Sequence, residues 1–96
     1  MASNTAFNML RVDLGFATGA VPAGVRKLMH MKLDAAMFRL AQAGIYIDET
    51  SPDDLDLLVM YSGWLYRCRD KQQEKPLALR DAIRNRQAAQ NVGSAT

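Results

Sequence analysis

The chain has 96 residues, of which 49% are hydrophobic and 23% are charged, and its formal net charge is +2. This length corresponds to one domain with a thin core, because a small domain keeps much of its surface in water. The net charge is too small to indicate nucleic-acid binding by itself, and no apolar run reaches the roughly 18 residues of a membrane span.

Cysteine and histidine each occur once, as Cys68 and His30. A single cysteine excludes an internal disulfide, and the two residues together supply too few ligands for a structural zinc site. The N-terminal sequence MASNTAFNMLRVDLG lacks the basic region followed by an apolar one that marks a signal peptide. We therefore expect a protein made in a reducing cytosol, with no metal and no cofactor.

Residues 1–14 predict a short amphipathic helix, because Phe7, Leu10 and Leu14 recur at spacings of three and four. Asn4 or Thr5 is a suitable N-cap. Residues 15–24 contain three glycines and a proline, which predicts a loop.

A second amphipathic helix is predicted from Pro22 or Gly24 to Ala43, about 30 Å long at about 1.5 Å per residue. Its apolar positions recur at threes and fours and are Val25, Leu28, Met29, Leu33, Ala36, Met37 and Leu40. Gly44 is expected to end the helix in the left-handed conformation, with Ile45 as the apolar contact that follows. Residues 45–50 are interpreted as an extended loop.

The third helix, residues 51–69, has the strongest start signal and an apolar surface on both sides. Ser51 is a suitable N-cap, Pro52 fits the first helical position, and Asp54 stands three residues after the cap. One apolar arc consists of Leu55, Leu58, Val59, Leu65 and Tyr66, and the other of Leu57, Met60, Tyr61, Trp64 and Cys68. Such a helix is covered on both sides, in part by another subunit, and Tyr61 and Trp64 are expected in the central core. Gly63 inside it predicts the close approach of another backbone.

Residues 70–75 are a polar linker, and Pro76 starts a fourth helix over residues 76–90 with a thin apolar stripe beside a basic one. Residues 91–96 are expected to fray or to bind a partner. The fold class is therefore all-α, a small bundle of about four helices with a flexible C-terminal segment. Residues 1–75 form the bundle core, and residues 76–96 form a basic, partner-binding extension.

Charge is segregated along the chain. Five acidic and no basic residues lie between Asp48 and Asp56, whereas seven basic and three acidic residues lie between Arg67 and Arg86. One interpretation is helix-end complementarity and solvated faces. The other is an acidic patch that meets a basic patch on a neighbouring copy, a heterologous contact that closes into a ring or grows into a fibre. The candidate residues for such patches are Asp48, Glu49, Asp53, Asp56, Arg67 and Arg69.

No motif indicates an enzyme. His30 and Asp34 are four residues apart and could pair, but no nucleophile or oxyanion site accompanies them. Cys68, among apolar residues, is interpreted as a packed thiol. The acidic run DETSPDD lacks the glycine and the distal glutamate of a calcium loop, so helix capping explains it better.

Arg80, Arg84 and Arg86 are candidates for a nucleic-acid surface. Arg80 and Arg84 fall on one helical face with Arg86 to the side, but no aromatic residue interleaves them in the sequence, so base stacking is not indicated. The second and third helices are too long, and their connection too extended, for a compact helix-turn-helix.

The run DAAMFRLAQAGIYIDETSPDDLDLLVMYSGWLYRCRDKQQEKPLALRDAIRNRQ, residues 34–87, resembles the head–tail connector (adaptor) proteins of long-tailed bacteriophages. Three features carry the resemblance. A helix ends in AGI before an acidic loop, an aspartate-capped helix reads LLVMYSGWLYRCR, and a polar break precedes the proline-led basic helix PLALRDAIRNRQ.

The resemblance implies a non-enzymatic structural protein of the virion neck, made in the bacterial cytoplasm, that forms a ring of about twelve copies. The ring would dock on the portal protein, bind a tail-completion or tail protein, and surround DNA that passes through without sequence-specific binding or any membrane contact. Portal contact falls by position on residues 76–96, which include Arg80, Arg84 and Arg86. The alternatives are a small helical DNA-binding or DNA-packaging accessory protein and a helical interaction module of the host.

Overall fold

The structure, a computed structural model, describes residues 4–16, 21–69 and 73–94. Within these ranges it consists of four α-helices and no strands, which confirms the all-α prediction. The helices are α1 (Asn4–Asp13), α2 (Ala23–Gln42), α3 (Pro52–Arg67) and α4 (Leu77–Ser94). α4 ends at Ser94, beyond the predicted end at Gln90, and residues 95–96 lie outside the described part of the chain.

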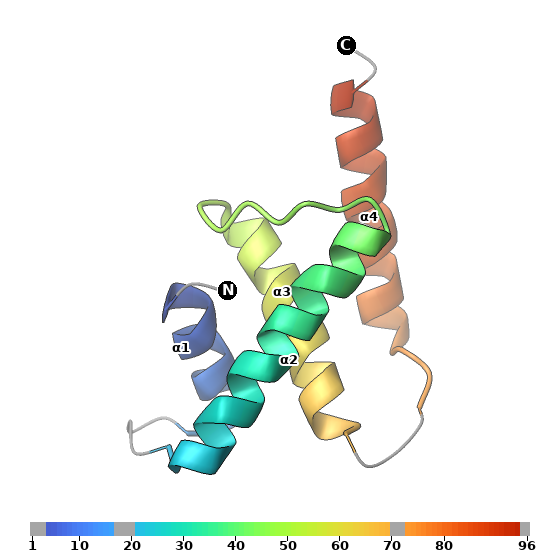
Figure 1. Cartoon of the computed structure of the whole chain (residues 1–96). Coiled ribbons are helices and arrows are strands. Elements are labelled where there is room, and N and C mark those ends of the chain that lie inside the picture. The colour runs from blue at the N-terminus through green and yellow to red at the C-terminus, as the bar shows by residue number, and fades with distance from the viewer. Residues whose placement is uncertain (1–3, 17–20, 70–72, 95–96) are drawn as a thin grey trace.

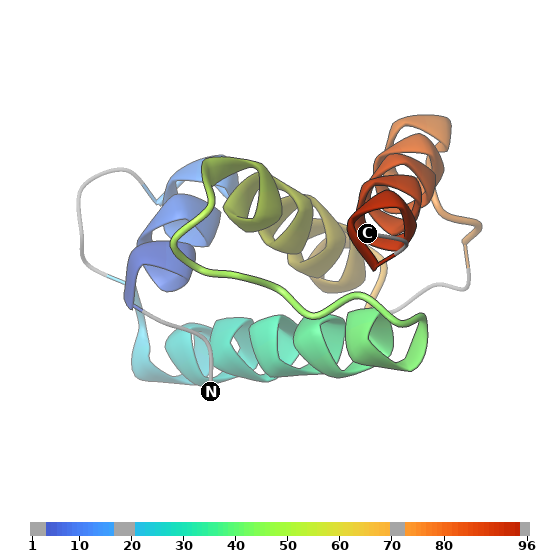
Figure 2. The same cartoon turned by 90° about the horizontal axis from the view of Figure 1, so that it is seen from above.

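The four described helices are arranged in two layers (Figures 1 and 2). α2 crosses α3 and makes up one layer, while α1, α3 and α4 lie in the other. α1 packs against both α2 and α3, and α4 packs against α3 at the end of the layer away from α1. None of the described helices is long and apolar enough to cross a membrane.

The start of α3 and the end of α2 lie at the residues that the sequence predicted. Ser51 caps α3, since its hydroxyl oxygen accepts from the Asp54 N–H at 3.4 Å, and Pro52 begins the helix. Gly44 has a φ of +84°, and the Ile45 N–H donates to the Leu40 carbonyl at 2.8 Å, which closes a Schellman motif. Ile45 is fully buried, so the predicted apolar contact after the glycine is confirmed.

The core lies between α1, α2 and α3, with a smaller contribution from α4. Its largest fully buried apolar side chains are Leu10, Met29, Leu33, Leu40, Ile45, Leu58 and Leu79. Tyr61 is 5% exposed and belongs to this core, as predicted. Trp64 is only half-buried at its edge, so its predicted central position is wrong. α4 packs on α3 through Leu79, and one side of the indole stays next to a groove described below.

The packing bears on two expectations about α3. Both apolar arcs of α3 are covered mainly by α1, α2 and α4 of the same chain, because α3 carries nine buried residues and only Met60 among its large apolar side chains is exposed. Cover by another subunit stays a prediction. The predicted approach of another backbone at Gly63 is wrong. Gly63 faces side chains and not a backbone. A Cβ there would lie 3.0 Å from Asp13 Oδ2 and 3.2 Å from an Arg67 guanidinium nitrogen.

Candidate interaction site

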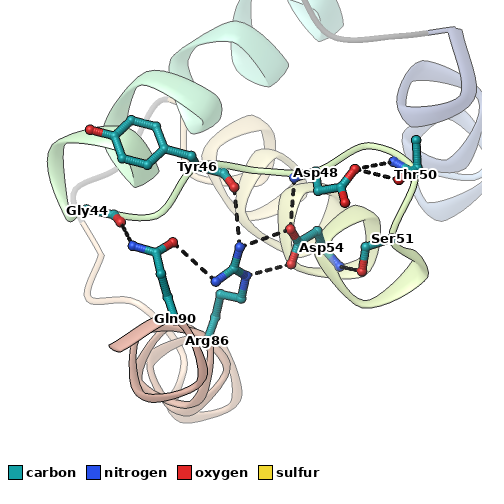
Figure 3. A network of polar contacts seen from close by, with 8 residues as sticks. All are labelled: Gly44, Tyr46, Asp48, Thr50, Ser51, Asp54, Arg86 and Gln90. Carbon is teal, nitrogen blue, oxygen red and sulfur yellow. Dashed lines mark hydrogen bonds and ion pairs between the residues drawn. The ribbon is translucent and has the colours of Figure 1, made fainter. Parts of the chain in front are cut away.

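A partly buried ion pair attaches α4 to the start of α3 (Figure 3). Arg86 Nε donates to Asp54 Oδ1 at 2.7 Å, and Arg86 Nη2 lies 3.3 Å from Asp54 Oδ2. The same carboxylate accepts from the Asp48 N–H at 2.8 Å, and the guanidinium also donates to the Tyr46 carbonyl at 3.3 Å and to Gln90 Oε1 at 3.2 Å. We call these contacts the Arg86 clamp.

Two glutamines extend the attachment to the end of α2. Gln87 Nε2 donates to the Ala43 carbonyl at 3.0 Å, and Gln90 Nε2 donates to the Gly44 carbonyl. Carbonyls at a helix C-terminus lack partners within their own helix, so these amides satisfy groups that α2 leaves open. α4 is therefore fixed to both α2 and α3 by polar contacts.

Two charged groups in and beside the clamp have shifted pKa values. The hydrogen bond to Asp54 raises the pKa of Arg86 above its ordinary value. The pKa of Asp48 is lowered, chiefly by the Thr50 hydroxyl, which donates at 2.6 Å, then by the Thr50 N–H at 2.9 Å, with a smaller effect of the Arg86 charge.

The structure separates the three arginines that the sequence grouped as a partner-binding set. Arg86 is taken up by the clamp, and its side chain is 23% exposed. Arg80 and Arg84 are exposed and line one groove. Arg84 also lies 4.0 Å from Asp81, an exposed pair of the kind that contributes little to stability.

Two arginines of the predicted basic patch have partners inside the chain. Arg67 pairs with Asp13 of α1 at 2.8 Å. Arg69 lies over the Tyr66 ring, 4.4 Å from its centroid, and donates to the Tyr66 carbonyl at 2.7 Å. Their roles toward a neighbouring copy stay predictions.

The residues of the predicted acidic patch lie near the start of α3. Asp48, Asp53 and Asp56 are exposed, and Glu49 is half-exposed. Their role toward a neighbouring copy also stays a prediction.

An open groove of about 770 Å³ lies between the end of α2, the middle of α3 and α4. We call it the basic groove, since its charged lining residues are Arg39, Lys75, Arg80 and Arg84 against the single acid Glu74. Its aromatic wall consists of Tyr61 and Trp64, which pack edge to face with centroids 5.9 Å apart. The Lys75 ammonium lies 5.5 Å from the Trp64 ring, within cation–π range.

A second groove, about 300 Å³ in volume, lies between the first turns of α3 and the middle of α4. We call it the acidic groove, because it is lined by Asp53, Asp54 and Asp56 against the single cation Arg86. Asp54 and Arg86 neutralise each other in the clamp, which leaves Asp53 and Asp56 as the excess charge. Met60, 39% exposed, gives this groove an apolar wall.

The two residues weighed for chemistry have packing roles. His30 stacks on Phe7 with ring centroids 4.4 Å apart, and its Nδ1 is buried without a hydrogen-bond partner in the described residues. Cys68 is half-buried at the end of α3, and its thiol contacts Gln73 Oε1 at 3.2 Å. Across residues 4–16, 21–69 and 73–94, no three histidine, cysteine or acidic side chains converge to hold a metal ion.

The Arg86 clamp was missed by the sequence analysis, and no local spacing could have revealed it, because its two charges are 32 residues apart. The one available signal was that Asp54 occupies the third position after the cap, where a carboxylate often turns back to the cap. In this fold the Asp54 carboxylate accepts from Asp48 and Arg86.

Comparison of the chain with protein-family models, curated proteins and solved structures finds no match.

Proposed function

We propose that this chain is a subunit of the head–tail connector of a long-tailed bacteriophage. In this role about twelve copies form a ring in the virion neck, which docks on the portal, receives a tail-completion protein and continues the DNA channel. The role is structural, with no reaction and no cofactor.

The observation that carries the proposal is the pair of oppositely charged grooves beside α4. The basic groove is lined by Arg80 and Arg84, and the acidic groove by Asp53 and Asp56. A molecule with two different, complementary surfaces joins head to tail, and such contacts close into rings when the rotation between copies allows it. Charge complementarity of this kind favours orientation and encounter more than affinity.

Residues 76–96 are the proposed contact with the portal. Within this segment Arg80 and Arg84 are exposed in the basic groove, which the contact between copies uses, so the later turns of α4 are left for the portal. Because Arg86 is bound to Asp54 in the clamp, its proposed role is to hold α4 in place, and other residues of the segment contact the portal.

The experiment is a mass measurement of the purified chain with and without the portal protein of the same phage. We expect a monomer or a mixture alone and a discrete ring on the portal, visible by electron microscopy of the complex. Lys27→Ala, which changes an exposed residue remote from both grooves, is the matched control and should assemble normally. A chain that stays monomeric in the presence of the portal would refute the proposal.

One observation favours the alternative function, a DNA-binding or DNA-packaging accessory protein. The fold brings Tyr61 and Trp64 beside the groove arginines, so an aromatic surface that the linear sequence did not indicate lies next to positive charge. Salt dependence separates the two functions. Binding to a labelled DNA duplex or single strand that weakens steeply between about 50 and 200 mM salt would support the accessory protein.

A further inference from the structure

We propose that the basic groove binds the residues around the acidic groove of a second copy of this chain. Copies then join head to tail through the two sides of α4. This inference deepens the proposed function and rests on it for the closed ring, whereas the contact between two copies can be tested alone. It assigns Arg80 and Arg84 to the neighbouring subunit and leaves the later turns of α4 to the portal.

The basic groove carries an excess of positive charge. Arg39, Arg80 and Arg84 are exposed and reach it from two helices, α2 and α4. Lys75 adds a fourth cation, held over the Trp64 ring at 5.5 Å. Four cations against Glu74 give the lining an excess of positive charge, which an acidic partner surface would neutralise.

The chain itself carries the complementary acidic surface. Asp53 and Asp56 are exposed on the first turns of α3. The single cation that lines the acidic groove, Arg86, is already bound to Asp54. The neighbouring Met60 is 39% exposed, and the basic groove offers the half-buried Trp64 and Ile83 as its apolar counterparts. Each groove therefore combines charge with an apolar wall.

The two grooves lie on opposite sides of α4. Arg80, Arg84 and Gln87 line the basic groove, whereas Ala82, Asn85 and Ala89 line the acidic one. At about 3.6 residues per turn, these two sets lie on opposite sides of α4. Between them, Leu79 and Arg86 fix α4 to the rest of the fold. The surfaces face different directions, so the same copy can offer one to each neighbour, as a heterologous contact requires.

A charge-reversal experiment on the full chain tests the inference. The groove variant is Arg80→Glu/Arg84→Glu, and the face variant is Asp53→Lys/Asp56→Lys. Each is expected to raise the concentration of half-assembly at low salt by at least about tenfold, as followed by sedimentation velocity, because like charges then meet. An equimolar mixture of the two is expected to assemble again, since each reversed surface finds a complementary one. Lys27→Glu/Lys32→Glu, which changes the net charge as the groove variant does but lies away from both grooves, should assemble as the wild type does.

The single tryptophan gives a second, independent measurement. Trp64 lies in the wall of the basic groove, and the chain has one tryptophan, so any emission comes from a residue that the proposed contact would cover. Titrating the wild type with a Trp64→Phe chain is expected to shift the emission. The same titrant carrying Asp53→Lys/Asp56→Lys should leave it unchanged. If that face variant does not fold by circular dichroism, Asp53→Asn/Asp56→Asn replaces it and should give a reduced shift.

Several results would overturn the inference. These are a wild type that stays monomeric at every concentration in low salt, a groove variant that assembles as the wild type does, or a mixture that fails to assemble. An emission shift with oligothymidylate and none with the second copy would assign the groove to nucleic acid. Assembly through the grooves without portal binding would refute the connector function alone, and portal docking unaffected by either variant would refute the groove contact alone.

Discussion

Arg86 Nε lies 2.7 Å from Asp54 Oδ1, and this contact joins the middle of α4 to the first turn of α3. Asp54 takes part both in the N-cap of α3 and in the attachment of α4. Its N–H is capped by Ser51, and its carboxylate, in a residue 4% exposed, accepts from both Arg86 and the Asp48 N–H. A buried carboxylate needs such partners, so the position of α4 depends on a residue that the sequence presents only as part of a helix start.

Removing the arginine of this pair is expected to destabilise the fold. Arg86→Ala leaves the Asp54 carboxylate buried without its counter-charge and should lower the free energy of unfolding by about 2–4 kcal/mol. Urea denaturation followed by circular dichroism measures this. Arg84→Ala, on the exposed side of the same helix, is the matched control and should change the free energy by less than about 0.5 kcal/mol. Equal effects of the two substitutions would show that the clamp does not hold α4.

A double-mutant cycle isolates the pair itself. Asp54→Ala should also be destabilising, but the double variant Asp54→Ala/Arg86→Ala should lose less than the sum of the two single changes. The expected coupling is about 1–3 kcal/mol, because the two side chains share one contact network. Additive losses would place the effect of Arg86 elsewhere, in its contacts with Tyr46 and Gln90.

The lowered pKa of Asp48 should depend on the hydroxyl of Thr50. Thr50→Val removes the donor at 2.6 Å and keeps the backbone donor at 2.9 Å, so the pKa of Asp48 should rise part of the way toward 3.8. Carboxyl chemical shifts followed by NMR against pH measure this, with Thr50→Ser as the variant that keeps the hydroxyl. An unchanged pKa in Thr50→Val would contradict the assignment of the hydroxyl as the main cause.

The sign of the linked stability follows from the direction of that shift. A carboxyl whose folded pKa lies below its unfolded value stabilises the fold above the unfolded value, and this contribution is lost as pH falls through the folded one. The difference in stability between the wild type and Thr50→Val should therefore be present at neutral pH and shrink in acid. Screening by solvent keeps it small, since Asp48 is exposed.

The local features of this fold were predictable because each depends on residues that are close together in the sequence. Apolar spacing predicted the helices, Ser51 and Pro52 predicted the start of α3, and Gly44 with Ile45 predicted the end of α2. These signals act within one or two helical turns, so they do not depend on how the helices pack.

The candidate site was not predictable in the same way, because its contacts join distant parts of the chain. Arg67 pairs with Asp13 across 54 positions, a contact that no periodicity encodes. Trp64 was placed in the core from its apolar neighbours, but its burial depends on where α4 lies, which the Arg86 clamp fixes. The sequence indicated charge segregation, and only the packing divided those charges into internal pairs and exposed grooves.

The close contact at Gly63 predicts that the effect of Gly63→Ala on stability depends on whether Asp13 is present. Gly63→Ala should gain about 1 kcal/mol of helix propensity and lose a similar amount, because its Cβ would displace Asp13 Oδ2, now 3.0 Å away. The net change in the free energy of unfolding should be below about 1 kcal/mol. In an Asp13→Ala chain that carboxylate is gone, and the Arg67 side chain, no longer paired with it, is free to move away from the Cβ, so Gly63→Ala should stabilise by about 1 kcal/mol. Identical effects in both backgrounds, measured by urea denaturation, would rule out Asp13 as the limiting neighbour.

Truncation tests the division of the chain at residue 75. Deleting residues 76–96 should leave α1, α2 and α3 helical, because they pack against one another, and should abolish docking on the portal. It also removes Leu79, 1% exposed in the core, and the counter-charge of Asp54, so the remaining fold should be less stable by several kcal/mol, on the order of 3–5.

A shorter deletion, of residues 91–96, keeps Leu79, Arg86 and Gln90 and is the matched control for stability. It should unfold at nearly the same urea concentration as the full chain, and its docking reports whether the last residues alone contact the portal. Circular dichroism decides the main point. If the longer deletion abolishes the helical signal of residues 1–75, α4 is part of the folding unit, and residues 76–96 are not a separable extension.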